Sequence, residues 1–173
     1  MNYKNEDSFI EVDEEYLDQK IKEKLSLFEY REYEDEENDE YVYEFKNKND
    51  DENLLIVVDG EATIYYADSH SHYGFYKSDI DELIQKTLDI FNNELKVVRF
   101  FSSERWLGDF WLHKTEVVDG VNFLEKQNFP REFIQELKRL GGMITETYWD
   151  EEDKIYTIAP LKYKGRFKMS VNC

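Results

Sequence analysis

The stretch LLIVVDGEATIYY, residues 54–66, determines the fold class of this chain. Leu54–Val58 is a continuous apolar run of strand length, and Ala62–Tyr66 is a second run rich in β-branched and aromatic residues. Asp59-Gly60 lies between them and is a typical hairpin turn, because glycine readily adopts the positive φ that tight turns need. The stretch therefore predicts two antiparallel strands.

Apolar and polar residues alternate on both sides of this hairpin. Tyr41, Tyr43 and Phe45 alternate with polar or smaller residues, as do Phe28 and Tyr30 before them, which predicts another hairpin with one buried face. Further strands of the same kind are expected at residues 95–101, 106–113, 143–149, 154–159 and 161–171.

Three segments have the periodicity and end signals of helices. Residues 13–25 begin with Asp13 as a capping residue, and their apolar positions recur every four residues. A second helix is expected from Ser78, with Asp81 as its capping-box partner, and a third from Pro130 to Gly141-Gly142. We therefore predict one α+β domain over residues 1–173, with mostly antiparallel sheet, helices packed on one face and residues 1–12 loosely ordered.

The negative charge of the chain is concentrated in its first third. The chain carries 40 Asp and Glu against 22 Lys and Arg, and residues 1–60 alone hold 21 acidic and 7 basic side chains. A surface of one sign attracts cationic partners and repels nucleic acids and anionic membranes. We therefore expect a basic protein partner, and we interpret the basic stripe Lys162, Lys164, Arg166 and Lys168 as pairing with the chain's own acids.

Other features of the composition indicate a cytoplasmic protein. The first residues are polar, and no run approaches the roughly 20 apolar residues of a membrane span. The single cysteine, Cys173, cannot form an internal disulfide. The sequence specifies no oligomeric state, and a subunit of a larger assembly remains an alternative.

The candidate partner-binding site is an acidic run between two expected strands. It comprises Glu34, Asp35, Glu36, Glu37, Asp39 and Glu40, flanked by Tyr33 and Tyr41. In an antiparallel meander successive turns lie at opposite ends of the sheet, so the Asp59-Gly60 turn should lie at the same end as this run. The alternative is a solvated loop that only keeps the protein soluble.

A second candidate contact is Trp111 with Asp109. If Trp106, Phe110 and Leu112 face the core, alternation places Trp111 and Asp109 near the surface. Tryptophan and tyrosine dominate binding hot spots, so an exposed tryptophan beside a carboxylate would suit a basic partner. The alternative is that these aromatic side chains belong to the core.

The motif DSHSH, residues 68–72, is the only candidate metal site. If it continues the strand from Ala62, then Asp68, His70 and His72 lie on one face and could bind Zn²⁺ or Fe²⁺. Alternatively, Asp68 caps a loop and the imidazoles are polar surface groups. No phosphate-binding glycine loop or nucleophile motif is present, so we assign no catalytic residue and expect a binding protein; a metal-dependent enzyme is the alternative.

Several parts of residues 64–112 together resemble a known group of proteins. They are YYADSHSHY at residues 65–73, the helix from Ser78, the strand residues 96–98 and WLGD at residues 106–109. This pattern resembles small acidic bacterial α+β proteins of the toxin-immunity type. The resemblance implies a cytoplasmic inhibitor that covers a toxin, and it supplies no catalytic residues. We expect no cofactor, with Zn²⁺ at Asp68, His70 and His72 as the alternative.

Overall fold

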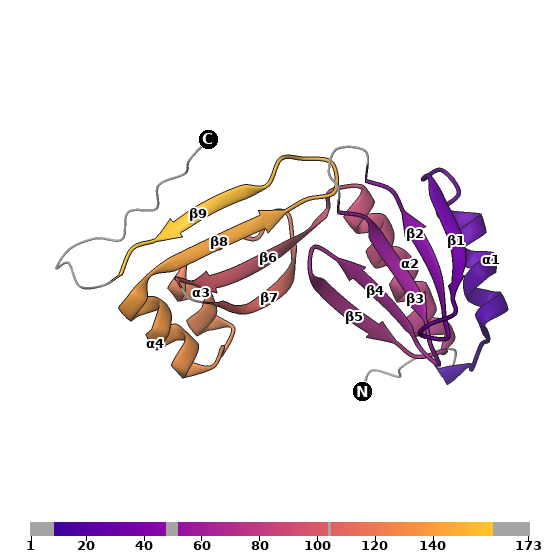
Figure 1. Cartoon of the computed structure of the whole chain (residues 1–173), viewed down its shortest axis with the longest axis horizontal. Coiled ribbons are helices and arrows are strands. Elements are labelled where there is room, and N and C mark those ends of the chain that lie inside the picture. The colour runs from indigo at the N-terminus through magenta and orange to yellow at the C-terminus, as the bar shows by residue number, and fades with distance from the viewer. Residues whose placement is uncertain (1–8, 48–51, 104, 161–173) are drawn as a thin grey trace, which may run out of the picture. The chain divides into compact units, whose positions relative to one another are not determined.

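The structure is a computed structural model that describes residues 9–47, 52–103 and 105–160. The chain divides into two compact units, residues 1–92 and residues 93–173, and each unit contains an antiparallel sheet and helices (Figure 1). The α+β class predicted from the sequence is thus confirmed. The prediction of one domain over residues 1–173 did not anticipate this division.

The sheet of the first unit is a meander of five strands. The strands are β1 (Tyr30–Asp35), β2 (Glu40–Phe45), β3 (Leu54–Val58), β4 (Ala62–Tyr66) and β5 (Ser69–Tyr73). Each strand pairs antiparallel with the next, in the order β1-β2-β3-β4-β5. Both predicted hairpins are therefore confirmed, and the histidine motif supplies a fifth strand.

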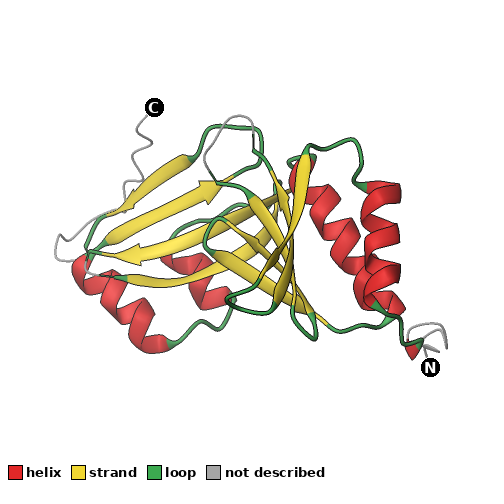
Figure 2. Ribbon diagram, turned by 45° about the vertical axis from the view of Figure 1, so that its right-hand side comes forward, coloured by secondary structure: helices red, strands yellow, loops and turns green. Residues whose placement is uncertain are grey.

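Two helices, α1 (Glu14–Lys24) and α2 (Lys77–Phe91), cover one face of this sheet (Figure 2). The Tyr43 hydroxyl donates to Asp18 of α1 at 3.2 Å, and the Phe45 ring lies 5.2 Å from the Phe91 ring of α2. Because alternate residues of a strand face opposite sides, residues in register with Tyr43 face the helices. Their neighbours along each strand face away from the helices.

The sequence predicts the N-terminal end of α1 correctly, but not that of α2. Asp13 caps α1 as expected, since its carboxylate accepts from the Tyr16 backbone N–H at 3.1 Å. The capping box at Ser78 is wrong: α2 begins one residue earlier, after Tyr76. The Val12 N–H donates to Phe75 and the Lys77 N–H donates to Ile10, which positions the entry to the helix. Residues 10–12 are therefore paired rather than loosely ordered, and residues 1–8 lie outside the described part.

The second unit contains a four-stranded sheet in the order β7-β6-β8-β9. Its strands are β6 (Leu95–Ser102), β7 (Trp106–His113), β8 (Gly142–Thr147) and β9 (Lys154–Ile158), all paired antiparallel as predicted. The helices α3 (Val121–Lys126) and α4 (Arg131–Leu140) contribute Leu124 and Leu137 to a core shared with Val98, Phe100 and Ile144. The predicted strand at residues 161–171 and the basic stripe at Lys162, Lys164, Arg166 and Lys168 lie outside the described residues.

Candidate functional site

The acidic run forms the tip of the β1–β2 hairpin, as predicted. Asp35 and Glu40 are the last registered pair of the two strands. The Asp35 carboxylate accepts from the Glu37 backbone N–H at 3.1 Å and from the Asn38 side-chain amide at 3.0 Å. Asp39 adopts a φ of +57°, which aspartate tolerates better than most residues. Local hydrogen bonds thus hold the turn despite the repulsion between its charges.

This tip forms one wall of a hollow of about 540 Å³, which we call the acidic hollow. The β3–β4 turn contributes Asp59 and Gly60, and the first turn of α1 contributes Glu14. The described residues that line it are Glu14, Glu34, Asp35, Glu36, Asp39, Glu40, Tyr41, Val58, Asp59 and Gly60. Seven of these ten are acids and none is a lysine or an arginine. The expectation that the Asp59-Gly60 turn shares an end with the acidic run is confirmed.

The two tyrosines beside the acidic run lie on different faces of the sheet. Tyr41 lines the acidic hollow, and its ring meets Tyr43 edge-on at 5.2 Å. Burial, with the nearby Glu32 charge, raises the pKa of the Tyr41 hydroxyl, so it stays a neutral donor. Tyr33 lies one position out of register, on the opposite face, where the Arg31 guanidinium covers its ring at 5.1 Å. Neither Tyr33 nor the exposed Glu37 is among the residues that line the hollow.

Sequence reasoning missed one wall of the acidic hollow. In the sequence, Glu14 is one of two acids in the first turn of a helix, where an acidic residue suits the helix dipole without any further role. Its contribution depends on α1 packing beside β2, which is a tertiary contact with no local signal. The position of Asp59, by contrast, followed from the alternation of turns in a meander.

Trp111 and Asp109 lie on the face of β7 opposite to Phe110 and Leu112, as alternation predicts, but neither side chain is fully exposed. Both side chains are half-buried, while Trp106 is 53% exposed. A β-bulge accounts for Trp106, which was expected to face the core: Phe100 pairs with Gly108 but Phe101 pairs with Trp106, so Leu107 is an extra residue and points into the core. These residues belong to the second unit, whereas the acidic hollow belongs to the first.

The predicted metal-ligand set is not formed, because Asp68 does not continue the strand from Ala62. Ala67 and Asp68 have φ values of +52° and +59° and turn the chain into β5. His70 and His72 share one face of β5, with ring centroids 4.9 Å apart. Within residues 9–47, 52–103 and 105–160, no group of three or more His, Cys, Asp or Glu side chains could hold a metal ion.

Each histidine of this pair has a different neighbour from the preceding strand or turn. The His72 Nδ1 atom lies 2.7 Å from Glu61 and 3.1 Å from the Thr63 hydroxyl. The His70 ring stacks on Tyr65 with 5.6 Å between centroids. The motif therefore builds an exposed aromatic and polar edge to the first sheet.

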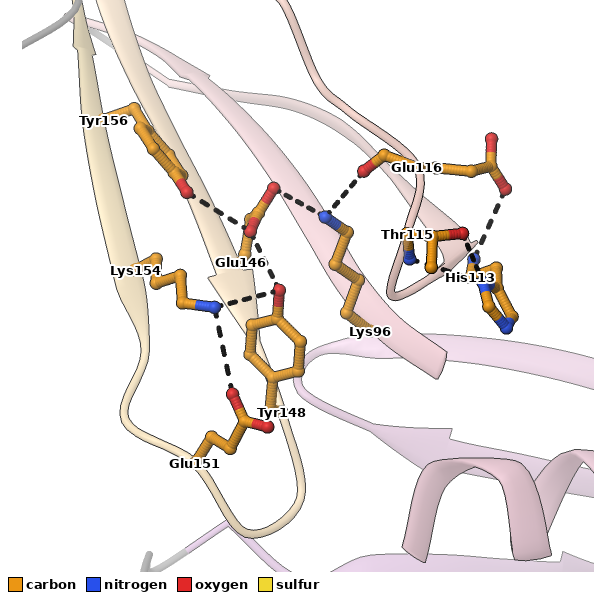
Figure 3. A network of polar contacts seen from close by, with 9 residues as sticks. All are labelled: Lys96, His113, Thr115, Glu116, Glu146, Tyr148, Glu151, Lys154 and Tyr156. Carbon is orange, nitrogen blue, oxygen red and sulfur yellow. Dashed lines mark hydrogen bonds and ion pairs between the residues drawn. The ribbon is translucent and has the colours of Figure 1, made fainter. Parts of the chain in front are cut away.

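A buried polar network in the second unit is the other concentration of titratable groups (Figure 3). Lys96 donates to Glu146 at 2.8 Å and to the Glu116 carbonyl at 2.9 Å. Glu146 also accepts from the Tyr148 hydroxyl at 3.0 Å and the Tyr156 hydroxyl at 3.4 Å. Burial and the Glu146 charge raise the pKa of Tyr148. Lys96 and Glu146 thus each have partners within the network that offset the cost of burying their charges.

Comparisons with protein-family models, with curated protein sequences and with solved structures found no match to this chain. The resemblance to toxin-immunity proteins therefore depends on the sequence pattern alone. Among the helices in the described ranges, none has the length and apolar character needed to cross a membrane.

Proposed function

We propose that this chain is a cytoplasmic binding protein of the toxin-immunity type, which covers a basic protein partner at the acidic hollow. The observation that supports the proposal is the lining of the hollow, where seven carboxylates from three separate elements converge without a lysine or an arginine. If the acidic run were only a solvated loop that keeps the protein soluble, carboxylates from the β1–β2 tip alone would be sufficient. The convergence of Glu14 and Asp59 on the same hollow favours a surface that meets a cation.

Electrostatic steering gives such a surface its function. A hollow lined by charges of one sign focuses the field and raises the local concentration of cationic partners. Complementary charge raises association rates to roughly 10⁸–10⁹ M⁻¹s⁻¹ at low salt, against about 10⁵–10⁶ M⁻¹s⁻¹ without steering. An inhibitor that acts by covering its target needs this speed and needs no catalytic group.

The immunity role is tested by expression together with the products of the adjacent genes. We expect one of these products to be basic, to arrest growth when expressed alone and to be neutralised by this chain in a stable complex. If none of them is neutralised, the immunity role is wrong.

The role of the acidic hollow is tested on that complex by stopped-flow mixing at low and high salt. We expect the triple variant Glu34→Gln, Glu36→Gln, Asp39→Asn to associate at least about tenfold more slowly at low salt, with the difference vanishing at high salt. The control variant Glu132→Gln, Glu151→Gln, Glu152→Gln removes the same charge from exposed positions of the second unit. Equal slowing by both variants would show that net charge alone, rather than the hollow, steers the partner.

A further inference from the structure

A second hollow, of about 380 Å³, lies at the other end of β4 from the Asp59-Gly60 turn, and we call it the Tyr65 pocket. Leu55 of β3, Tyr65 of β4 and His70 of β5 line it, with Glu52 and Asp68 among its remaining lining residues. It lies on the face of the sheet that α1 and α2 do not cover, because Tyr65 is out of register with the helix-facing Ile64. The Tyr65 pocket is thus separate from the acidic hollow.

The wall of the Tyr65 pocket is a row of side chains that crosses three strands. Leu55 is in register with Tyr65, and Tyr65 is in register with His70. The His70 ring stacks on the Tyr65 ring, whose side chain is nevertheless 41% exposed. An exposed tyrosine held by its neighbours offers a large apolar surface at little entropic cost, as binding hot spots do.

Carboxylates complete the Tyr65 pocket. Asp68 lies in the two-residue turn whose positive φ values join β4 directly to β5, so the backbone holds it beside the aromatic row. Glu52 lines the pocket from the chain that leads into β3. Histidine apart, none of the described lining residues is basic. An aromatic wall with adjacent carboxylates is complementary to a flat cation that has an apolar stem.

We propose that the Tyr65 pocket binds an arginine side chain of a protein partner. This proposal rests on the proposed function in one respect only, namely that the partner is basic. The arginine stem packs against Leu55, its guanidinium stacks on the Tyr65 ring, and the carboxylate of Asp68 attracts the charge. Guanidinium is planar and weakly hydrated, so it stacks on aromatic faces, whereas the compact ammonium of lysine is strongly hydrated. The pocket therefore selects arginine over lysine.

The test is an NMR titration of the full chain with Nα-acetyl-arginine amide. The matched probes are the citrulline amide, which has nearly the same shape without the charge, and the lysine amide, which has the charge without the plane. We expect saturable shifts at Tyr65, Asp68 and His70 with the arginine probe at millimolar concentrations, and at least about fivefold weaker binding of the other two probes there. Equal binding of lysine or citrulline, or an absence of saturable shifts, would overturn the proposal.

Variants show whether the same residues form the pocket. We expect Tyr65→Leu and Asp68→Asn each to weaken arginine binding at least about fivefold; asparagine tolerates the positive φ of that turn. Tyr76→Leu replaces another exposed tyrosine outside the pocket and should leave binding unchanged. If Tyr65→Leu binds arginine as the unaltered chain does, the pocket is not the site. Steering at the acidic hollow is measured separately with the Glu34 triple variant, so either proposal can fail alone.

Discussion

Lys96 and Glu146 form an ion pair of 2.8 Å in which the side chains are only 3% and 7% exposed. The two residues come from adjacent strands, β6 and β8, and face the same side of the sheet as the core residues Val98 and Ile144. Burying a carboxylate and an ammonium is costly unless each finds partners. Here Glu146 has three donors and Lys96 has two acceptors, so the pair is tolerated at the end of an apolar core.

We predict that Lys96→Met destabilises the second unit by about 3–5 kcal/mol, because it leaves the Glu146 charge buried without its cation. Adding Glu146→Gln removes that charge and keeps an oxygen for the tyrosine hydroxyls, so the double variant should regain at least about 1 kcal/mol. Urea unfolding followed by tryptophan fluorescence checks this, since all three tryptophans belong to the second unit. A double variant less stable than Lys96→Met would contradict the account.

The sequence predicts the hairpins well because strand alternation and turn chemistry are local signals. Leu54–Val58 and Ala62–Tyr66, for example, form the expected pair joined at Asp59-Gly60. The bulge at Leu107 is not predictable in this way, since it depends on how Phe100 and Phe101 pair across the sheet. The helix α3 was also missed, because its six residues are too few to establish a period and its start has no side-chain cap.

In the candidate site, too, the sequence predicts the features that depend on local signals and not those that depend on tertiary packing. The acidic tip and the position of Asp59 follow from the strand order, whereas the contribution of Glu14 requires the packing of α1. The alternation argument holds for Trp111, which lies off the core face, but one extra residue in β7 places Leu107 in the core and exposes Trp106. Within residues 68–72, the two serines are compatible with either a strand or a turn. In the structure Asp68 belongs to the turn that joins β4 to β5, and β5 begins at the next residue, Ser69.

Glycine at position 142 is required by the close approach of its neighbours. A Cβ there would overlap the Phe101 carbonyl oxygen and lie 2.6 Å from the Leu137 side chain. We predict that Gly142→Ala costs about 3 kcal/mol, because the backbone of β6 cannot move without losing its pairing. Gly60→Ala is the comparison: no atom lies within 4 Å of its Cβ, so only the φ of +64° should cost stability, about 1 kcal/mol. Chemical denaturation measures both, and a smaller loss at Gly142 than at Gly60 would be inconsistent with the packing.

Alkaline pH should destabilise the first unit through Tyr73. Burial and the Glu82 charge raise the pKa of its hydroxyl to about 12, above the ordinary value of 10.0. The folded state thus favours the neutral phenol, so its stabilising effect is complete below pH 10 and is lost as pH rises toward 12. We predict that the unaltered chain loses about 1 kcal/mol relative to Tyr73→Phe between pH 9 and pH 11. Circular dichroism during urea unfolding at each pH checks this, and a constant difference would show that Tyr73 ionises normally.

The acidic hollow should reduce the stability of the free protein. Seven carboxylates around one hollow repel each other, and two charges about 4 Å apart already interact by about 1 kcal/mol in water. We predict that Glu34→Gln, Glu36→Gln, Asp39→Asn raises the free energy of unfolding by about 1 kcal/mol at low salt, with a smaller gain at high salt. Circular dichroism during urea unfolding measures the effect.

The control for this last prediction is Glu132→Gln, Glu151→Gln, Glu152→Gln, which removes the same charge elsewhere. It should give no stabilisation, because Glu151 lies 3.8 Å from Lys154 and favours the folded state weakly. When a cationic partner binds the acidic hollow, it should relieve the repulsion between carboxylates that the free protein tolerates. If the hollow variant is no more stable than the control at low salt, the carboxylates do not strain the free protein, and relief of repulsion does not contribute to binding.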